Sequence, residues 1–200
     1  SLNPKTIPLP QDFSITKMTT QIPLPPQDTT QITTTTPPME TAPPIVEDPN
    51  DAGELSNNIM IYKNRGIPIY YGSFENGQVY AAYVNAYKAD LGETVNVYSM
   101  VCPTAISFYW PSYSNISHGS EPENLENIRN NLNGVQDVNV HDILMEHKNE
   151  YIYSRTDHHW QALGAYYAAK KFAEQCNLPF ADIRTYEKVV VPGYVGTLYG

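Results

Sequence analysis

Two hydropathy patterns run through residues 56–200 of this chain. Apolar residues recur at four-residue steps from Val79 to Leu91 and stop at Gly92, which is the spacing of a helix that ends at a glycine. Other stretches are short, β-branched and bounded by turn residues, which is typical of strands. Strands are expected at residues 59–62, 67–71, 94–101, 135–140, 151–153 and 188–191, and helices at residues 78–91, 121–132, 142–148 and 156–176. Strands and helices that alternate in this way predict an α/β fold with a doubly wound, mostly parallel sheet.

Residues 1–55 follow neither pattern, because proline and threonine interrupt every apolar run. The motif Ile-Pro-Leu-Pro occurs twice, beginning at Ile7 and at Ile22, and most of the 17 prolines lie before residue 50. Proline fixes φ and removes a backbone donor, so such stretches favour extended conformations. We therefore expect a linker or an extended arm over residues 1–55, followed by one α/β domain over residues 56–200.

The charge balance excludes one class of partner. The formal net charge is −9 and the isoelectric point is near 4.9, whereas nucleic-acid binding is favoured by clustered Lys and Arg.

No stretch reaches the 18 consecutive apolar residues of a membrane span. The chain opens at Ser1 rather than at Met, which fits either an upstream signal or anchor that has been removed or a cleaved tag.

Tyrosine and cysteine each leave two interpretations open. The 16 tyrosines suit protein or carbohydrate surfaces, because Tyr has a flat apolar face and a polar tip, but they also suit an ordinary core and rim. Cys102 and Cys176 lack CxxC spacing and lie on different expected elements. They form either a disulfide or two buried thiols.

The segment Thr156-Asp157-His158-His159-Trp160 follows the expected strand at residues 151–153, where functional groups of doubly wound sheets collect. One interpretation is structural: Thr156 or Asp157 caps a helix, and Trp160 packs that helix onto the sheet. The other is chemical: Asp157 accepts from the Nδ1–H of a histidine and leaves Nε2 free to take a proton from a nucleophile. The structural interpretation leaves the two adjacent histidines unexplained, so both stay open.

Metal binding is a third use of these side chains. The candidate ligands are Asp157, His158 and His159, together with His141 or His147. The chain has no HExxH motif, and adjacent histidines seldom bind one ion together, so neither a metal nor another cofactor is expected. His118 lies in a loop rich in Ser, Asn and Gly, where it either lines the site or is solvated.

Residues 153–168, which read YSRTDHHWQALGAYYA, resemble the signature of the bacterial DHHW protein family. Two upstream stretches, VNVYSMVCPT at residues 95–104 and FYWP at residues 108–111, are similar to that family's strand and following loop. The resemblance extends over roughly residues 58–200. More distantly, the chain resembles the SGNH-hydrolase-like domains of alginate O-acetyltransferases, in which an Asp-x-His-Trp motif supplies two members of a Ser-His-Asp triad.

The resemblance implies a role for each residue of the motif. Asp157 would be the orienting acid and His159 the base, while Trp160 would pack beneath them. Trp160, His158 and His118 are the candidates for contact with a substrate.

The nucleophile is the part of the pattern that differs. In the SGNH-like domains a serine follows the Asp-x-His motif in a Gly-Asp-Ser-like turn, and this sequence reaches Gly200 without one, so the domain is expected to be incomplete at its carboxyl end. Within the chain, Ser73 in Gly72-Ser73-Phe74 follows an expected strand and is a weaker candidate. It lacks the preceding Asp and reads equally well as a turn serine.

These features predict a bacterial SGNH-like esterase or O-acetyltransferase, secreted or attached to the cell surface. Its substrate would be a cell-surface polysaccharide or a small ester, and its chemistry would use an Asp-His-(Ser) triad. The alternative is a non-catalytic surface module that binds glycan or protein through its tyrosines, with the Asp-His-His-Trp segment acting as a structural cap.

Overall fold

The computed structural model describes residues 46–189 and 193–199. The chain divides into two units, residues 1–36 and 37–200, and every described residue belongs to the second unit. The expected Pro/Thr-rich segment, including both Ile-Pro-Leu-Pro motifs, lies outside the described residues up to residue 45. Its role as a linker or arm, and the domain boundary after residue 55, remain predictions.

Three short strands form an antiparallel sheet in the order β1 (Glu54–Ser56), β2 (Ile59–Tyr62) and β3 (Arg65–Pro68). The turns between them are Asn57-Asn58 and Lys63-Asn64, and these four residues have φ values between 47° and 63°. Positive φ at both central residues is the type I′ geometry of a two-residue hairpin. A connection this short can join only antiparallel strands, because parallel strands need a crossover of a dozen residues or more.

A second sheet pairs β4 (Tyr98–Ser99) with β5 (Gln136–Asp137) in parallel. The strands expected at residues 94–101 and 135–140 are therefore only two residues long. The expected strand at 151–153 is reduced to an isolated bridge between Tyr153 and Trp160. Residues 188 and 189 form no strand, and the rest of the strand expected at 188–191 lies outside the described residues.

The predicted doubly wound, mostly parallel, SGNH-hydrolase-like sheet is wrong. The described residues contain a three-stranded antiparallel sheet, a two-stranded parallel sheet and five α-helices. The reason is visible at Ile152 and Tyr153, which are 0% and 1% exposed although they belong to no strand. A buried loop selects the same apolar residues as a buried strand, so a short apolar run does not distinguish the two.

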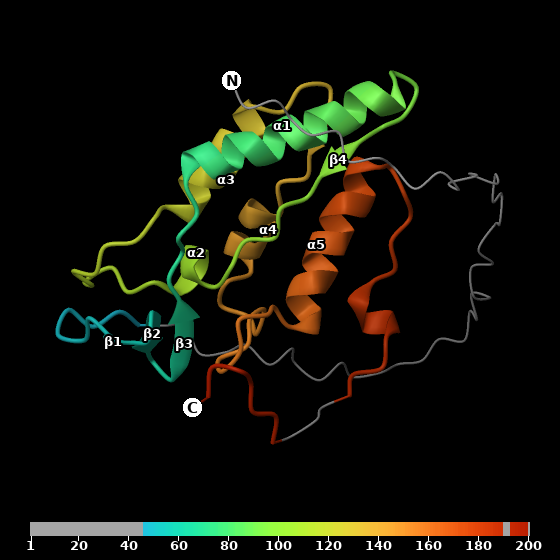
Figure 1. The fold of residues 1–200 in the computed structure, drawn as a ribbon. Coiled ribbons are helices and arrows are strands. Elements are labelled where there is room, and N and C mark those ends of the chain that lie inside the picture. Colours follow the sequence, from blue (N-terminus) through green and yellow to red (C-terminus); the bar gives the residue numbers. More distant parts are fainter. Residues whose placement is uncertain (1–45, 190–192, 200) are drawn as a thin grey trace. The chain divides into compact units, whose positions relative to one another are not determined.

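The helices agree better with the periodicity than the strands do. They are α1 (Phe74–Leu91), α2 (Ile106–Tyr109), α3 (Glu121–Asn130), α4 (Val140–Glu146), α5 (Ala162–Gln175) and the 3₁₀ turn η1 (Ile183–Thr185). The helices expected at residues 78–91 and 121–132 are confirmed, with shifted ends. Figure 1 shows α1 beside α3 and α4 beside α5, and both pairs are in contact. The helix expected from residue 156 begins only at Ala162.

The main hydrophobic core joins the antiparallel sheet to α2 and to the chain before α5. Met60 and Ile67 from the sheet, Phe108 from α2, and Ile152 and Tyr153 are all members. The rings of Phe108 and Tyr153 stack with their centroids 5.5 Å apart. In the described part of the chain, every helix falls short of the length and apolarity that crossing a membrane requires.

Candidate functional site

Residues 154–160 form a closed loop ahead of α5. The backbone N–H of Ser154 donates to the carbonyl of His159 (3.2 Å), and the N–H of Gln161 donates to the carbonyl of Ile152 (2.8 Å). Inside the loop, Oδ1 of Asp157 accepts from the backbone N–H of His159 two residues later (2.9 Å). Such an Asx turn offers the backbone an alternative to helical hydrogen bonds, which explains why α5 does not begin at residue 156.

The hairpin of β2 and β3 holds the base of this loop. Arg65 is buried, and its Nη1 donates to the carbonyls of Ser154 (2.9 Å) and Tyr153 (3.2 Å). The N–H of Gly66 donates to the carbonyl of Arg155 (2.8 Å). Burial lowers the pKa of Arg65, but a guanidinium stays charged at neutral pH. The loop is therefore attached to the sheet through its backbone, which leaves the side chains at its tip available.

Asp157 is the buried centre of the loop, with 2% of its surface exposed. Its Oδ1 faces His159, and its Oδ2 accepts from the hydroxyl of Tyr194 (3.2 Å) and from the N–H and Oγ1 of Thr197 (3.1 Å each). The backbone N–H groups of His159 and Thr197 are the main causes that hold the pKa of Asp157 well below its ordinary value. Asp157 is therefore an ionised carboxylate at neutral pH.

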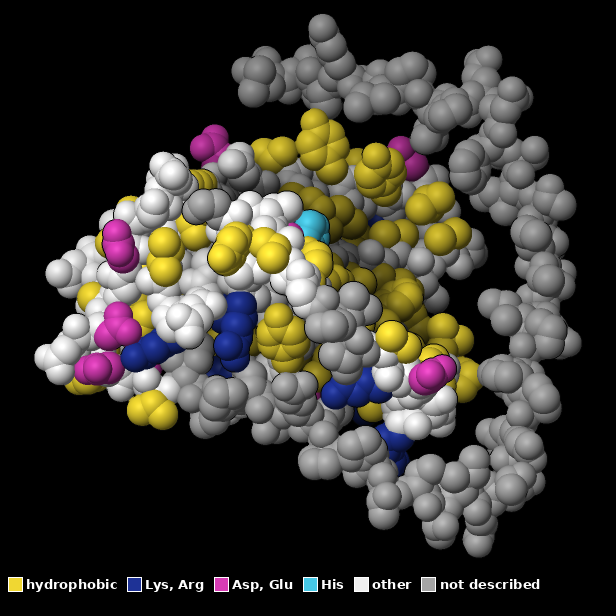
Figure 2. All heavy atoms as spheres, turned by 90° about the horizontal axis from the view of Figure 1, so that it is seen from below, with side chains coloured by type: hydrophobic (Ala, Val, Ile, Leu, Met, Phe, Trp, Pro, Cys, Tyr) yellow, Lys and Arg dark blue, Asp and Glu magenta, His cyan; other side chains and the backbone are white. Residues whose placement is uncertain are grey.

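The ring of His159 contacts this carboxylate with one nitrogen and is otherwise exposed to solvent. Its Nδ1 lies 2.6 Å from Oδ1 of Asp157, and 69% of the side chain is exposed. An ionised carboxylate can only accept, so Nδ1 must be the protonated nitrogen, and in the neutral ring Nε2 then carries a free lone pair. Figure 2, which shows the molecule of Figure 1 from below, has histidine atoms at the surface of this face, next to hydrophobic side chains.

Residues 193–199 also belong to the site, and the sequence did not predict this. Besides the bonds to Asp157, the N–H of Gly196 donates to Oγ1 of Thr156 (3.1 Å), and the N–H of Leu198 donates to the carbonyl of Thr156 (2.9 Å). Sequence offered one usable signal, the glycine at position 196. A Cβ there would lie 2.2 Å from the carbonyl oxygen of Thr156, so the close approach of the two segments requires glycine.

The His158 side chain faces residues 193–199 rather than the Asp157 carboxylate. Its Nδ1 lies 3.3 Å from Oγ1 of Thr197 and 3.9 Å from Oδ1 of Asp157, and its ring is tilted against that of His159 with centroids 3.9 Å apart. Asp157, His158 and His159 are close enough to hold a metal ion together. An ion at Oδ1 would compete with two N–H donors of His159, so this arrangement suits a hydrogen-bonded pair better than a metal site.

Trp160 lies beneath the pair. It is half-buried and pairs with Tyr153 through the isolated bridge. It packs against the main hydrophobic core and against a second buried cluster made of Val138, Val140 and Ala168. This is a packing position, and its proposed contact with a substrate remains a prediction.

His118 and Ser73 are not part of the hydrogen-bonded cluster around Asp157 in the described chain. The ring of His118 lies against Trp110, with centroids 4.3 Å apart, and its Nδ1 is 2.7 Å from the carbonyl of Gly119. Ser73 is the N-cap of α1, where its Oγ accepts from the N–H of Asn76 (3.2 Å). Their roles as a substrate contact and as a nucleophile remain predictions.

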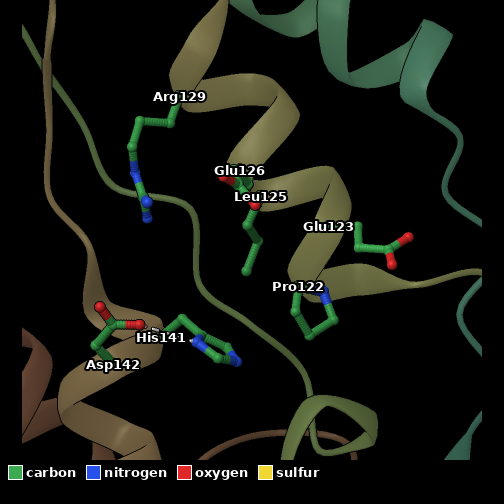
Figure 3. A pocket seen from close by; sticks show the side chains of 7 residues that line it. All are labelled: Pro122, Glu123, Leu125, Glu126, Arg129, His141 and Asp142. Carbon is green, nitrogen blue, oxygen red and sulfur yellow. Dashed lines mark hydrogen bonds and ion pairs between the residues drawn. The ribbon is translucent and has the colours of Figure 1, made fainter.

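The other two candidate ligands, His147 and His141, lie outside this cluster. His147 has Nδ1 2.5 Å from Oε1 of Glu150 and stacks on Tyr167. His141 lines a surface pocket of about 240 Å³ between α3 and α4. Figure 3 shows His141 and Asp142 on one side of this pocket, with side chains of α3 on the other. Both cysteines are free, and Cys102 is exposed, so neither a disulfide nor a pair of buried thiols is present.

The chain is similar to known proteins in sequence and in structure. The sequence profile described as DHHW protein matches residues 49–200. The crystal structure of a DHHW family protein from Eubacterium siraeum is 38% identical, with a TM-score of 0.67, and the match covers 74% of this chain and 49% of that one. PatB1 from Bacillus cereus is 20% identical, with a TM-score of 0.49, and the match covers 62% of this chain and 45% of PatB1.

The chain thus spans about half the length of the solved proteins that it matches. No curated protein matches it. The profile match over three quarters of the sequence includes the Asp157 loop, the hairpin that holds it and the segment at residues 193–199. The chain belongs to the DHHW protein family.

Proposed function

We propose that Asp157 and His159 are the orienting acid and the general base of an ester-hydrolysing or acyl-transferring site. The observation that carries the proposal is the contact of 2.6 Å between Nδ1 of an exposed histidine and a buried carboxylate oxygen. A pair of this kind fixes the histidine tautomer, directs Nε2 outward and stabilises the imidazolium that forms during the reaction.

In this mechanism, Nε2 of His159 removes the proton from a serine hydroxyl as that oxygen attacks the acyl carbonyl. The tetrahedral intermediate collapses when the proton passes from Nε2 to the leaving alcohol, which leaves an acyl-serine. Water or a second alcohol then accepts the acyl group by the same steps in reverse. Within the chain, Ser73 is the weaker candidate for this serine: it caps α1, where its Oγ accepts from the N–H of Asn76, and among the described residues it is not part of the hydrogen-bonded cluster around Asp157.

Activity, substrate and location belong to the same proposal, because the chain spans about half of its solved relatives. The expected substrate is an O-acyl group on a cell-surface polysaccharide or a small ester. The expected location is outside the cell or on its surface, and this rests on the Pro/Thr-rich sequence before the domain.

The test is hydrolysis of p-nitrophenyl acetate by wild type, His159→Ala and Asp157→Asn. General-base catalysis contributes roughly 10²–10⁴-fold, so both variants should lose at least about 100-fold in rate. His147→Gln is the matched control, because His147 also contacts a carboxylate, at 2.5 Å from Glu150, outside this site. Equal rates for His159→Ala and wild type would remove the proposed base.

One observation favours a second candidate function, binding without catalysis. Helix α1 exposes an apolar row at Val79, Tyr83, Tyr87 and Leu91, each 49–59% accessible. Tyrosines in such a row are suited to stacking on sugar rings or on a protein surface. The double variant Tyr83→Ala/Tyr87→Ala should then lose retention on immobilised polysaccharide while keeping any esterase activity, and unchanged retention would exclude this surface as a polysaccharide-binding face.

A further inference from the structure

Thr197 contacts the Asp157 carboxylate on the side opposite His159. Its backbone N–H and its Oγ1 each lie 3.1 Å from Oδ2, while Nδ1 of His159 lies 2.6 Å from Oδ1. The terminal torsion of an aspartate is broad, so donors on one oxygen alone leave the carboxylate free to turn. Donors on both oxygens fix its plane, and on Oδ2 the hydroxyl of Tyr194 (3.2 Å) adds to the two donors of Thr197.

We infer that Thr197 is a positioning residue: its hydroxyl acts with its own N–H and with the hydroxyl of Tyr194 to hold the Asp157 carboxylate in the rotation that points Oδ1 at Nδ1 of His159. Its consequence for catalysis rests on the proposed function. The geometric part of the inference does not, because it concerns only the carboxylate and the histidine ring.

His158 completes the orientation of the Thr197 hydroxyl. A hydroxyl has one proton to donate, and the ionised carboxylate is the partner that can only accept it. Oγ1 of Thr197 therefore receives a hydrogen bond from His158, whose Nδ1 lies 3.3 Å away. This gives His158 a role that the sequence did not suggest: it supports Thr197 from the solvent side.

The backbone of this segment is docked independently of the Thr197 side chain. The N–H groups of Gly196 and Leu198 donate to Oγ1 and to the carbonyl of Thr156. A Cβ at Gly196 would lie 2.5 Å from Cβ of Asp157, which shows how closely the two segments approach. A change confined to the Thr197 hydroxyl should therefore leave the segment in place.

Thr197→Val is the decisive variant, because it keeps the shape and the N–H of the residue but removes the hydroxyl. The Asp157 carboxyl is titrated by carbon-13 NMR, and the Nδ1–H proton of His159 is followed by proton NMR. Hydrogen bonds to a carboxylate favour its charged form, so the pKa of Asp157 should rise toward its ordinary value in Thr197→Val. Thr197→Ser should restore the wild-type titration. Thr185→Val is the matched control, since its hydroxyl donates to the carbonyl of Asp182 instead.

A merely structural Thr197 would lower thermal stability without moving the Asp157 titration. An unchanged titration in Thr197→Val, or a failure of Thr197→Ser to restore it, overturns the inference.

Kinetics separate this inference from the proposed function. With an active esterase, kcat of Thr197→Val should fall roughly tenfold at unchanged KM, which corresponds to about 1.4 kcal/mol in the transition state. Thr197→Ser should recover most of the rate. If His159→Ala hydrolyses the ester as fast as wild type, the proposed function fails, and the NMR titration alone decides the role of Thr197.

Discussion

Gly164 in the first turn of α5 lies against the base of the Asp157 loop, and its replacement by alanine is predicted to destabilise the protein. A Cβ at this position would lie 2.6 Å from the carbonyl oxygen of Ile152. That carbonyl accepts from Gln161 at 2.8 Å and so closes the base of the loop. Because the obstacle is backbone, relief requires α5 or the loop to shift.

Two effects of opposite sign decide the magnitude. Alanine is a better helix former than glycine by about 1 kcal/mol, which would stabilise Gly164→Ala if the position were free. Overpacking a buried site costs about 1–3 kcal/mol, and a contact of 2.6 Å with backbone belongs to the costly end. We expect a net loss of roughly 1–2 kcal/mol, or about 2–8 °C in the thermal midpoint.

Urea and thermal unfolding followed by circular dichroism measure this difference. Ala165→Gly, one residue further along α5, is the control for helix propensity and should cost about 1 kcal/mol. If Gly164→Ala is as stable as wild type or more stable, the contact with Ile152 does not constrain the loop, and the reasoning fails. The variant should also weaken the coupling of His159 to Asp157, visible in the Nδ1–H resonance.

Three further predictions concern titration and thiols. The pKa of Asp157 lies below its ordinary value, chiefly because the N–H groups of His159 and Thr197 donate to the carboxylate. The ionised carboxylate therefore contributes its full stabilisation above the ordinary pKa, and this stabilisation is lost as pH falls through the lowered pKa of the folded protein. Wild type should therefore stay more stable than Asp157→Asn well below pH ~4 in acid unfolding, and convergence already near that pH would contradict this. Burial raises the pKa of Tyr109 to about 12, although the nearby charge of Arg65 acts in the opposite direction. The stability linked to this phenol is therefore complete below pH ~10, and it is lost as pH rises toward the pKa of Tyr109 in the folded protein. Tyr109→Phe should show a shallower alkaline loss of stability between these limits, and parallel curves would refute the assignment. Cys102 and Cys176 are free, so Ellman's reagent should titrate two thiols per denatured chain with and without prior reduction, and a count that rises on reduction would reveal a disulfide.

The helices could largely be predicted because their signals are local. The four-residue spacing that ends at Leu91 acts within a few residues of the helix that it defines. The start of α5 was wrong by six residues. The Asp157 side chain there takes the backbone N–H of His159, and an Asx turn looks like a helix start in sequence.

The sheet could not be predicted in the same way. The apolar run at residues 94–101 suits a long strand, but only Tyr98 and Ser99 find partners, in β5. Strand length and direction are set by the partner, which is distant in sequence. The two-residue turns at Asn57-Asn58 and Lys63-Asn64 were a local sign of antiparallel pairing that the alternation of strands and helices concealed.

By itself, the sequence determined the family motif, the placement of Asp157 and His159 near each other, and most of the helices, because all of these depend on neighbours within a few residues. Only the tertiary structure decided that 2% of Asp157 is exposed while 69% of the His159 side chain is, and that Tyr194 and Thr197 complete the carboxylate's hydrogen bonds. Thr197 lies 40 residues beyond Asp157 in sequence. No periodicity or spacing encodes such a contact, because it exists only when two backbones dock closely, and that docking is fixed by the packing of the whole domain.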